Sequence, residues 1–323
     1  MKKITWRSFV FSVLSLLASG LAFAQAQLPP IIKIYVAYPA GGASDSVARL
    51  LGDRLSRSLN RPVVIENRAG ADGVIAMDAV AKAPKDGSVI GFSAISPFTI
   101  TAHIRKLPFE AKSVVPLVQV MYSPGLLVGT SATTANTLAE LLAQAKQKPG
   151  AVRWGNSGSV SLSSLLLEQL KADSGADIIS VPYKGGSQLL MDALGGQFEI
   201  MAINAAPSVL QSVKQGKLRV LAVTSPSRLD SLPNVPTLAE LGHPSANLIS
   251  IFGLFIPAGV PESTAKELTS AVGKILADPE IKSGIADTGN VLMAGSSAEF
   301  ASRIASESLV NERIIKRGGI KAE

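Results

Sequence analysis

Short apolar runs rich in β-branched residues alternate with segments of helical periodicity from residue 28 onward. This alternation is typical of α/β proteins, in which a helix follows each strand and the sheet is parallel. The predicted strands span residues 31–37, 62–66, 89–93, 114–120, 125–129, 152–155, 178–181, 198–203, 218–224 and 248–257. The break at Pro124-Gly125 marks a crossover between two α/β blocks, and the strand at 248–257 marks the return. We therefore predict an α/β fold with two domains.

Capping signals mark the start of several predicted helices. The first helix starts at Ser44, with Ser44 and Asp45 as candidate caps, and presents Val47, Leu50, Leu51, Leu55 and Leu59 on one face. Other helix starts are predicted at the capping-box pairs Thr137 with Glu140, Thr237 with Glu240, and Ser296 with Glu299, at Ser187, and at Asp278-Pro279.

The N-terminus has the pattern of a secretory signal peptide. Lys2, Lys3 and Arg7 precede an apolar run, and small residues of the A-x-A type follow it. We predict that residues 1–26 are removed, with cleavage after Ala24 or Ala26, and that the protein is secreted to the periplasm. The apolar run is too short for a retained membrane span.

The remaining charge does not indicate a nucleic-acid partner. Removing the three basic residues of the signal peptide leaves 28 basic and 24 acidic residues, a net charge of +4. The basic residues are scattered and form no stripe with interleaved aromatic residues, so we expect no nucleic-acid binding. The chain has no cysteine, which excludes disulfides and thiolate catalysis.

Catalytic motifs are nearly absent. The sequence holds no phosphate loop, no HExxH zinc helix and no GxSxG nucleophile elbow, and its two histidines are His103 and His243. We therefore predict a protein without catalytic residues, metal or cofactor. A hydrolase with His103 or His243 beside a serine is the enzyme alternative.

The stretch after the first strand is the leading candidate for a binding site. It contains Tyr38, Pro39, Ala40, Gly41, Gly42, Ala43, Ser44 and Asp45. Unpaired N–H groups at a helix start favour an anion, and glycines let it approach the backbone closely. We predict a carboxylate-binding loop here; the alternative is an ordinary βα turn. Asp45 is assigned to capping and loop support, or to a ligand contact through water or an amino group.

Further polar turns follow other strands and would lie at the same edge of each sheet. Their candidate ligand-binding residues are Ser93, Ser96, Asn156, Ser157, Ser159, Ser161, Ser163, Tyr183, Lys184, Gly185 and Asn204. Glycine, serine and asparagine are also ordinary turn residues, so each loop alone has a purely structural explanation. The Arg68 side chain could bind an acidic ligand or pair with Glu66 or Asp72. The Lys184 side chain could contact the ligand or lie in solvent. Together the loops predict a cleft that binds a ligand by hydrogen bonds.

A collinear series of motifs resembles the substrate-binding receptors of tripartite tricarboxylate transporters, the Bug family. The motifs are PAGGASD (39–45), ENRAGADG (66–73), LPFE (107–110), VPYKGG (181–186), LAVTS (221–225), LPNVPTLAELG (232–242) and FGLFIPAGVP (252–261). The resemblance implies a type II periplasmic binding-protein fold, with two α/β domains joined by two crossing strands around a ligand cleft. The domains would be residues 27–124 with 250–323, and residues 125–249.

The resemblance also implies a function without chemistry. A small organic carboxylate would bind in the cleft, with its carboxylate on the backbone N–H groups of residues 38–45, and the protein would deliver it to the membrane components of the transporter. The alternative keeps the fold but has a membrane sensor kinase read the liganded state. We expect a monomer.

Several residues depart from the family pattern and bear on the ligand. They are Leu162 and Ser164 within 161–164, Asp72 in place of a glycine, Val74 in place of an asparagine, and Ile95-Ser96 in place of a Thr-His pair. Because these changes remove polar groups near the expected cleft, we predict a compact carboxylate with an apolar, for example aromatic, remainder.

Overall fold

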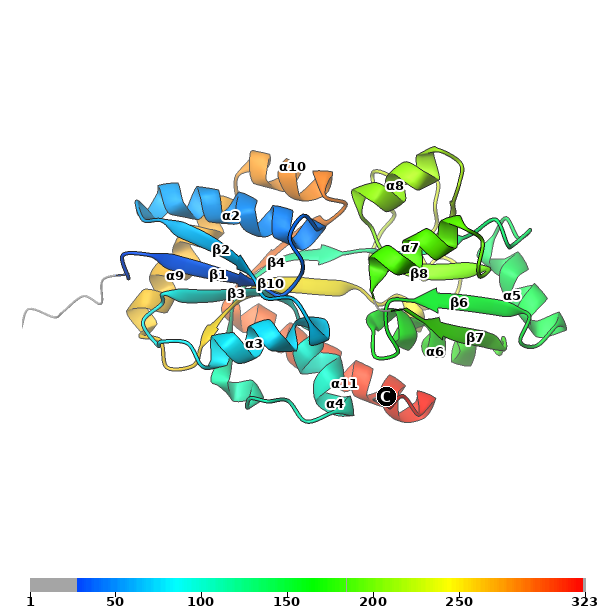
Figure 1. The fold of residues 1–323 in the computed structure, drawn as a ribbon, viewed down its shortest axis with the longest axis horizontal. Helices are drawn as coiled ribbons and strands as arrows, with labels where there is room; N and C mark the ends of the chain where they lie inside the picture. Colours follow the sequence, from blue (N-terminus) through cyan, green and yellow to red (C-terminus); the bar gives the residue numbers. More distant parts are fainter. Residues whose placement is uncertain (1–27, 184, 322–323) are drawn as a thin grey trace, which may run out of the picture.

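The structure, a computed structural model, describes residues 28–183 and 185–321 and contains two β-sheets with helices on both faces of each (Figure 1). The predicted signal peptide lies outside the described residues. No helix of the described part combines the length and the apolar character that a bilayer crossing requires.

The first sheet has six strands in the order β11-β4-β10-β3-β1-β2. Their bounds are β1 (Ile32–Val36), β2 (Val63–Asn67), β3 (Val89–Ala94), β4 (Val114–Ser123), β10 (Ser250–Pro257) and β11 (Val291–Gly295). β1 pairs in parallel with β2 and β3, whereas β10 runs antiparallel to β3 and β4, and β11 antiparallel to β4.

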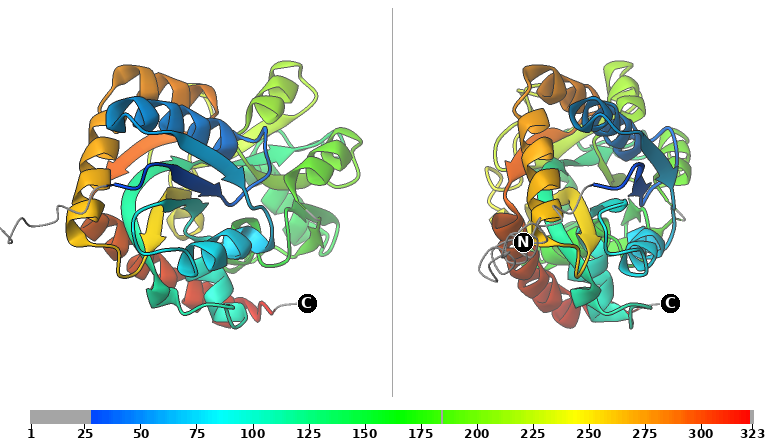
Figure 2. Two further views of the ribbon diagram at one scale, coloured as in Figure 1. Left: turned by 60° about the vertical axis from the view of Figure 1, so that its left-hand side comes forward. Right: turned by 90° about the vertical axis from the view of Figure 1, so that its left-hand side faces the viewer.

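Two helical layers cover the six-stranded sheet (Figure 2). One face is packed by α2 (Ala43–Leu59), α9 (Glu262–Leu276) and α10 (Pro279–Asp287), and the other by α3 (Val74–Ala81) and α11 (Ser297–Gly318). The helix α2 buries Val47, Leu51 and Leu55 at the predicted helical spacing. We call this sheet with its helices the six-stranded half.

The second sheet has five strands in the order β7-β6-β8-β5-β9. Their bounds are β5 (Gly125–Gly129), β6 (Val152–Asn156), β7 (Ile178–Pro182), β8 (Ile200–Asn204) and β9 (Arg219–Thr224). β6 is parallel to β7 and β8, and β5 is antiparallel to β8 and β9. One face is packed by α5 (Leu138–Gln147) and α6 (Leu162–Ser174), the other by α7 (Gly186–Leu194) and α8 (Pro207–Lys214). This is the five-stranded half.

Short helical turns complete the described elements. They are η1 (Ala71–Gly73), η2 (Pro97–Thr101), α4 (Ala102–Ile104), η3 (Ala111–Ser113) and η4 (Pro244–Ala246).

The two halves are connected at three places. The chain passes from β4 through Pro124 into β5, and it returns from β9 to β10 through residues 225–249. The long helix α11 forms a third, noncovalent link (Figure 1): Phe300 packs in the six-stranded half, while Ile314 and Ile315 pack in the five-stranded half. Strands β4 and β10 therefore lie where the halves meet.

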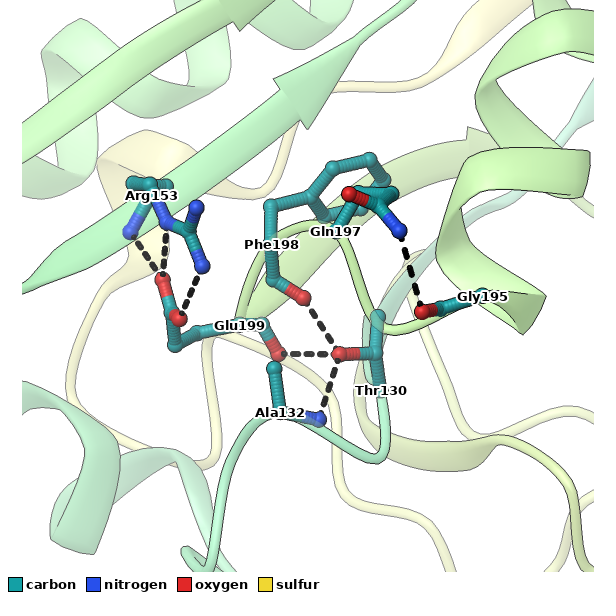
Figure 3. Close-up of polar contacts among 7 residues, drawn as sticks. All are labelled: Thr130, Ala132, Arg153, Gly195, Gln197, Phe198 and Glu199. Atoms are coloured by element: carbon teal, nitrogen blue, oxygen red, sulfur yellow. Dashed lines mark hydrogen bonds and ion pairs between the residues drawn. The ribbon is translucent and has the colours of Figure 1, made fainter.

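A polar cluster lies at the end of the five-stranded sheet where β5 ends and where β6 and β8 begin (Figure 3). The Glu199 carboxylate accepts hydrogen bonds from the backbone N (2.7 Å), Nε (3.1 Å) and a terminal nitrogen (2.7 Å) of Arg153. The Thr130 hydroxyl donates to the Phe198 carbonyl and accepts from the Ala132 amide. Because these contacts join the ends of β5, β6 and β8, the cluster is structural.

The expectation of parallel sheets is wrong in part, because both sheets are mixed. A strand that returns from the other half enters its sheet against the direction of its neighbours, as β10 does beside β3 and β4. The edge strand β11 has no counterpart among the predicted strands.

Two predicted helix starts are also wrong. Thr237 and Glu240 exchange both capping-box bonds, but the segment continues as turns because the Leu238 amide donates to Val223 of β9. Ser187 lies inside the first turn of α7, whose N-cap is Gly185. By contrast, Ser296 and Glu299 form the predicted capping box of α11.

Candidate ligand-binding site

A cavity of about 240 Å³ lies between the two halves, at the carboxyl ends of β3, β6 and β8 and beside the crossing strands. Residues of both halves line it. The structure brings together six predicted site residues there, namely Tyr38, Ser96, Ser157, Ser161, Ser163 and Asn204.

The wall on the six-stranded side combines aromatic and polar groups. The Tyr38 ring packs against the ring of Phe252 on β10, with centroids 5.6 Å apart. Burial raises the pKa of the Tyr38 phenol to about 12, and polar groups of Ala94, Ser96 and Ser93 offset part of that effect. The phenol is therefore neutral at physiological pH and can both donate and accept a hydrogen bond.

The wall on the five-stranded side contains the N-terminus of α6. Ser161 is the N-cap of this helix, and its hydroxyl accepts from the Ser164 amide (3.3 Å) and donates to the Gly158 carbonyl (2.7 Å). The Ser163 hydroxyl accepts from the Trp154 indole (3.3 Å) and donates to the Ala202 carbonyl (3.2 Å). These bonds fix the helix start, where a partial positive charge favours an anion.

Two groups at strand ends complete the polar lining. Asn204, at the end of β8, is exposed, and its side-chain amide has no hydrogen-bond partner among the described residues. Thr224, at the end of β9, accepts a bond from the Gly125 amide (2.8 Å), which ties the two strands at the cavity edge. The Asn204 amide is thus available to a ligand, while the Thr224 hydroxyl already accepts one hydrogen bond from the protein.

Residues 40–45 do not line this cavity, although they follow directly after Tyr38. The Asp45 side chain is buried, and its carboxylate accepts from the Gly41 amide (2.9 Å), Arg49 Nε (2.9 Å) and Asn67 Nδ2 (2.8 Å). Burial would raise the pKa of Asp45, but these hydrogen bonds outweigh it and lower the pKa below its ordinary value. Asp45 therefore supports the loop.

The start of α2 keeps free amides. Its N-cap is Gly42 and no side chain caps it, so the expectation that Ser44 or Asp45 is the N-cap is wrong. Within the described ranges, the amides of Gly42, Ala43 and Ser44 donate no hydrogen bond, whereas Gly41 donates to Asp45. Gly41 has a φ of 79°, a conformation that favours glycine.

Several other predicted site residues lie outside the cavity lining. Asn156 is fully buried and bonds Ser180 and the Gly158 amide. Tyr183 packs on Phe198, with ring centroids 5.6 Å apart. The remaining ones are Ser93, which is buried and donates to the Ala94 carbonyl, Ser159, and Gly185, the N-cap of α7. Lys184 falls outside the described residues.

The cavity lining also contains residues that the sequence did not point to as ligand contacts. The polar ones are Asp72, Thr224 and Ser250, and the larger apolar ones are Val160, Leu162, Leu166, Ile203, Leu248 and Phe252. The sequence points to Asp72 only as a departure from a family glycine and as a possible partner of Arg68. The others lie on β8, β9, α6 and the segment before it, and on the return into β10, where sequence alone does not show which side faces the cavity.

His103 and His243, which were considered for catalysis, and Arg68, which was considered for an acidic ligand, all lie outside the cavity lining. His103 Nε2 is 2.7 Å from the Ser308 hydroxyl, next to α11 and outside the cavity lining. Arg68 pairs with Glu66 (3.0 Å) and its guanidinium lies 3.8 Å from the Tyr35 ring centroid, so the structural alternative for Arg68 is confirmed. Residues 28–183 and 185–321 contain no cluster of three or more metal-ligating His, Cys, Asp or Glu side chains.

Two α/β halves, with a cavity between them that both polar and apolar residues line, define a solute-binding protein of the periplasmic type. The chain belongs to the tripartite tricarboxylate transporter family of receptors, whose family model matches residues 47–320.

Individual relatives agree with this assignment. Protein BugT of Bordetella pertussis is 34% identical over 263 residues, which cover 80% of each chain. The structure of R. palustris Rpa4515 with adipate is 29% identical, with a TM-score of 0.82 over 91% of this chain and 99% of that one. The structure of the periplasmic binding protein BugD is 26% identical, with a TM-score of 0.78 over 91% and 99%.

These findings confirm the predicted family and the predicted periplasmic binding-protein fold. The protein is a receptor that binds a solute and is not an enzyme, as the sequence indicated.

Proposed function

We propose that the protein captures a small organic carboxylate in the cavity between its halves and delivers it to the membrane components of a tripartite tricarboxylate transporter. The observation that carries this proposal is the composition of the cavity, whose lining combines polar groups and apolar side chains from both halves. Such a site binds reversibly and aligns a ligand without reacting with it.

The donors suit a carboxylate. Among the described residues, the Ser157 hydroxyl and the Asn204 amide have no acceptor in the protein and are free to donate to a ligand. The hydroxyls of Ser161, Ser163 and Ser96 already donate to backbone carbonyls and position the cavity wall. Hydrogen bonds to an ionised acceptor are stronger than those between neutral groups, so the free donors favour an anion.

The loop at the start of α2 would add to this set. Residues 40–45 follow directly after the lining residue Tyr38, and within the described residues the amides of Gly42, Ala43 and Ser44 donate no hydrogen bond, so they are free to bond a carboxylate oxygen. We propose that residues 27–124 with 250–323 and residues 125–249 move as two domains, and that closure brings the loop of residues 40–45 toward the ligand from one side and Tyr183 and Gly185 toward it from the other. A ligand held by both halves would stabilise the closed state over the open one.

The apolar lining favours a ligand with an apolar remainder. Leu162, Leu166 and Ile203 face the cavity on one side and Phe252 on the other. The related Rpa4515 was solved with adipate, a dicarboxylate with an aliphatic chain. We propose the same general class, a carboxylate on a compact aliphatic or aromatic body.

The proposed function also implies a location and an oligomeric state for the receptor. We propose that residues 1–26 direct the chain to the periplasm and are removed, and that the receptor acts as a monomer because one chain forms the whole cavity. The family assignment favours transport over the sensor-kinase alternative.

A thermal-shift screen of the purified protein against citrate, adipate, aliphatic monocarboxylates and aromatic acids tests the proposal. We expect stabilisation by compact carboxylates with an apolar body, followed by saturable binding in calorimetry. Tight binding of citrate with no response to aliphatic or aromatic acids would contradict the proposed ligand class. The absence of any carboxylate response would contradict the proposed function.

A further inference from the structure

Asp72 is the one charged residue among the described residues that line the cavity. Beyond the effect of burial, its charge lies close enough to the Tyr38 phenol to raise the pKa of that group. An isolated carboxylate is unexpected in a site that binds anions, because like charges in a partly desolvated cavity repel one another. The charge of Asp72 should therefore have a partner either in the protein or in the ligand.

The fold does not use this carboxylate. Within the described residues it takes part in no hydrogen bond and no ion pair, and only the backbone carbonyl of Asp72 is engaged, by the Ser96 hydroxyl (3.4 Å). Asp72 does not cap the following helix either, since neither η1 nor α3 has a side-chain cap. Within the described residues, the charge of Asp72 therefore has no structural role in a hydrogen bond, an ion pair or a helix cap.

The backbone around Asp72 holds it in an uncommon conformation. The φ angles of Gly70, Ala71, Asp72 and Gly73 are 130°, 48°, 54° and 95°, so four successive residues have positive φ. Positive φ is uncommon for residues other than glycine, and such outliers concentrate at ligand sites. Partial burial raises the pKa of the Asp72 carboxyl, and the charge of Arg105 opposes that effect.

The other half of the molecule presents the opposite polarity. Leu162 and Ser163 of α6 and Gly186 of α7 line the cavity, so two helix N-termini, each with partial positive charge, meet it. The cavity thus has a negative group on the six-stranded side and anion-favouring groups on the five-stranded side.

We propose that the receptor selects a carboxylate that also carries a protonated amine, with the ammonium group bound by Asp72 and the carboxylate directed to the helix N-termini and hydroxyls of the five-stranded half. This inference rests on the proposed function and narrows its ligand class. The adjacent Tyr38 phenol and Ser96 hydroxyl would supply acceptors for the remaining ammonium hydrogens.

Matched ligand pairs and one isosteric variant test the inference. Calorimetry would compare succinate with aspartate, adipate with 2-aminoadipate, hexanoate with 6-aminohexanoate, and 3-phenylpropionate with phenylalanine. The variant is Asp72→Asn, because asparagine adopts positive φ readily and removes only the charge. Asp53→Asn is the control, since it removes one exposed charge from α2 outside the cavity lining.

We expect wild-type protein and Asp53→Asn to bind the aminated member of at least one pair about tenfold or more tightly than its partner. Asp72→Asn should lose this preference and bind the unaminated partner as well as, or better than, the wild type does. If unaminated acids bind best and Asp72→Asn changes nothing, the inference is wrong while the proposed function stands. If no acid of either kind binds the wild type, both fail.

Discussion

The Asp45 carboxylate accepts a hydrogen bond from the Gly41 amide at 2.9 Å, so the helix α2 anchors the glycine loop that precedes it. The same carboxylate holds Asn67 Nδ2, which also donates to the Tyr38 carbonyl (3.1 Å). One buried acid thereby fixes both ends of the stretch from Tyr38 to Asp45. This role explains why an acid can lie next to a loop for which we propose carboxylate binding.

Replacing Asp45 by alanine should therefore destabilise the protein. The change leaves the Gly41 amide and the Asn67 side chain without their acceptor, at a cost of about 1–3 kcal/mol. Urea denaturation measures the free energy of unfolding, and calorimetry should show weaker ligand binding as well. The control is Arg49→Ala, which breaks only the exposed side of the network and should cost less than about 1 kcal/mol. Equal costs for the two variants would contradict the anchoring role.

Gly42→Val should abolish ligand binding while leaving the fold intact. A Cβ atom at Gly42 meets only the Pro39 carbonyl oxygen, at an ordinary 3.5 Å, and the extended φ of −81° suits any residue. The side chain would cover the free amides of the α2 N-terminus. Gly273→Val on α9 is the control, because an added Cβ there meets nothing within 4 Å. Unchanged affinity in Gly42→Val, with the same thermal midpoint, would mean that the loop is only a turn.

The ion pair of Arg153 with Glu199 should contribute pH-dependent stability. Burial raises the pKa of Glu199, but its hydrogen bonds with Arg153 outweigh this effect and lower it below the ordinary value of 4.5. A depressed folded-state pKa means that the stabilisation is present above the unfolded value and is lost as the pH falls through the folded one.

Glu199→Gln should accordingly lower the unfolding free energy at pH 7 by about 1 kcal/mol, a modest value because Arg153 is half exposed. The difference from the wild type should shrink as the pH falls below about 4.5, as chemical denaturation at several pH values would show. Ligand affinity at pH 7 should stay the same, since Arg153 and Glu199 lie at the starts of β6 and β8, whereas the cavity lies at the carboxyl ends of these strands. A stability difference that does not vary with pH would contradict this explanation.

Most strands and helices follow from local patterns. Buried strands such as β3 are continuous apolar runs, and α2 and α11 have the apolar spacing and turn residues of amphipathic helices. Local patterns do not predict the edge strand β11, because four of its five residues are half-exposed and one is exposed, and because it forms only by pairing with β4. The turn at Thr237 likewise depends on a hydrogen bond to β9, which is remote in sequence.

The site was predictable in location but not in detail. Strand ends and polar turns identify the edge where Ser96, Ser157 and Asn204 gather. Which serine of the loop after β6 faces the cavity depends on backbone angles that the sequence does not specify. Asp72 shows the same limit, because the positive φ of residues 70–73 is a tertiary property.

The most direct test of the binding cavity compares two serines of one loop. Ser157 lines the cavity and Ser159, two residues later, does not. The measurement is the calorimetric affinity of Ser157→Trp and Ser159→Trp for the carboxylate that most stabilises the wild-type protein. We predict that an indole at residue 157 fills the cavity and weakens binding about a hundredfold or more, while Ser159→Trp stays within about threefold of the wild type. Wild-type affinity in Ser157→Trp would contradict the claim that the carboxylate binds between the two halves.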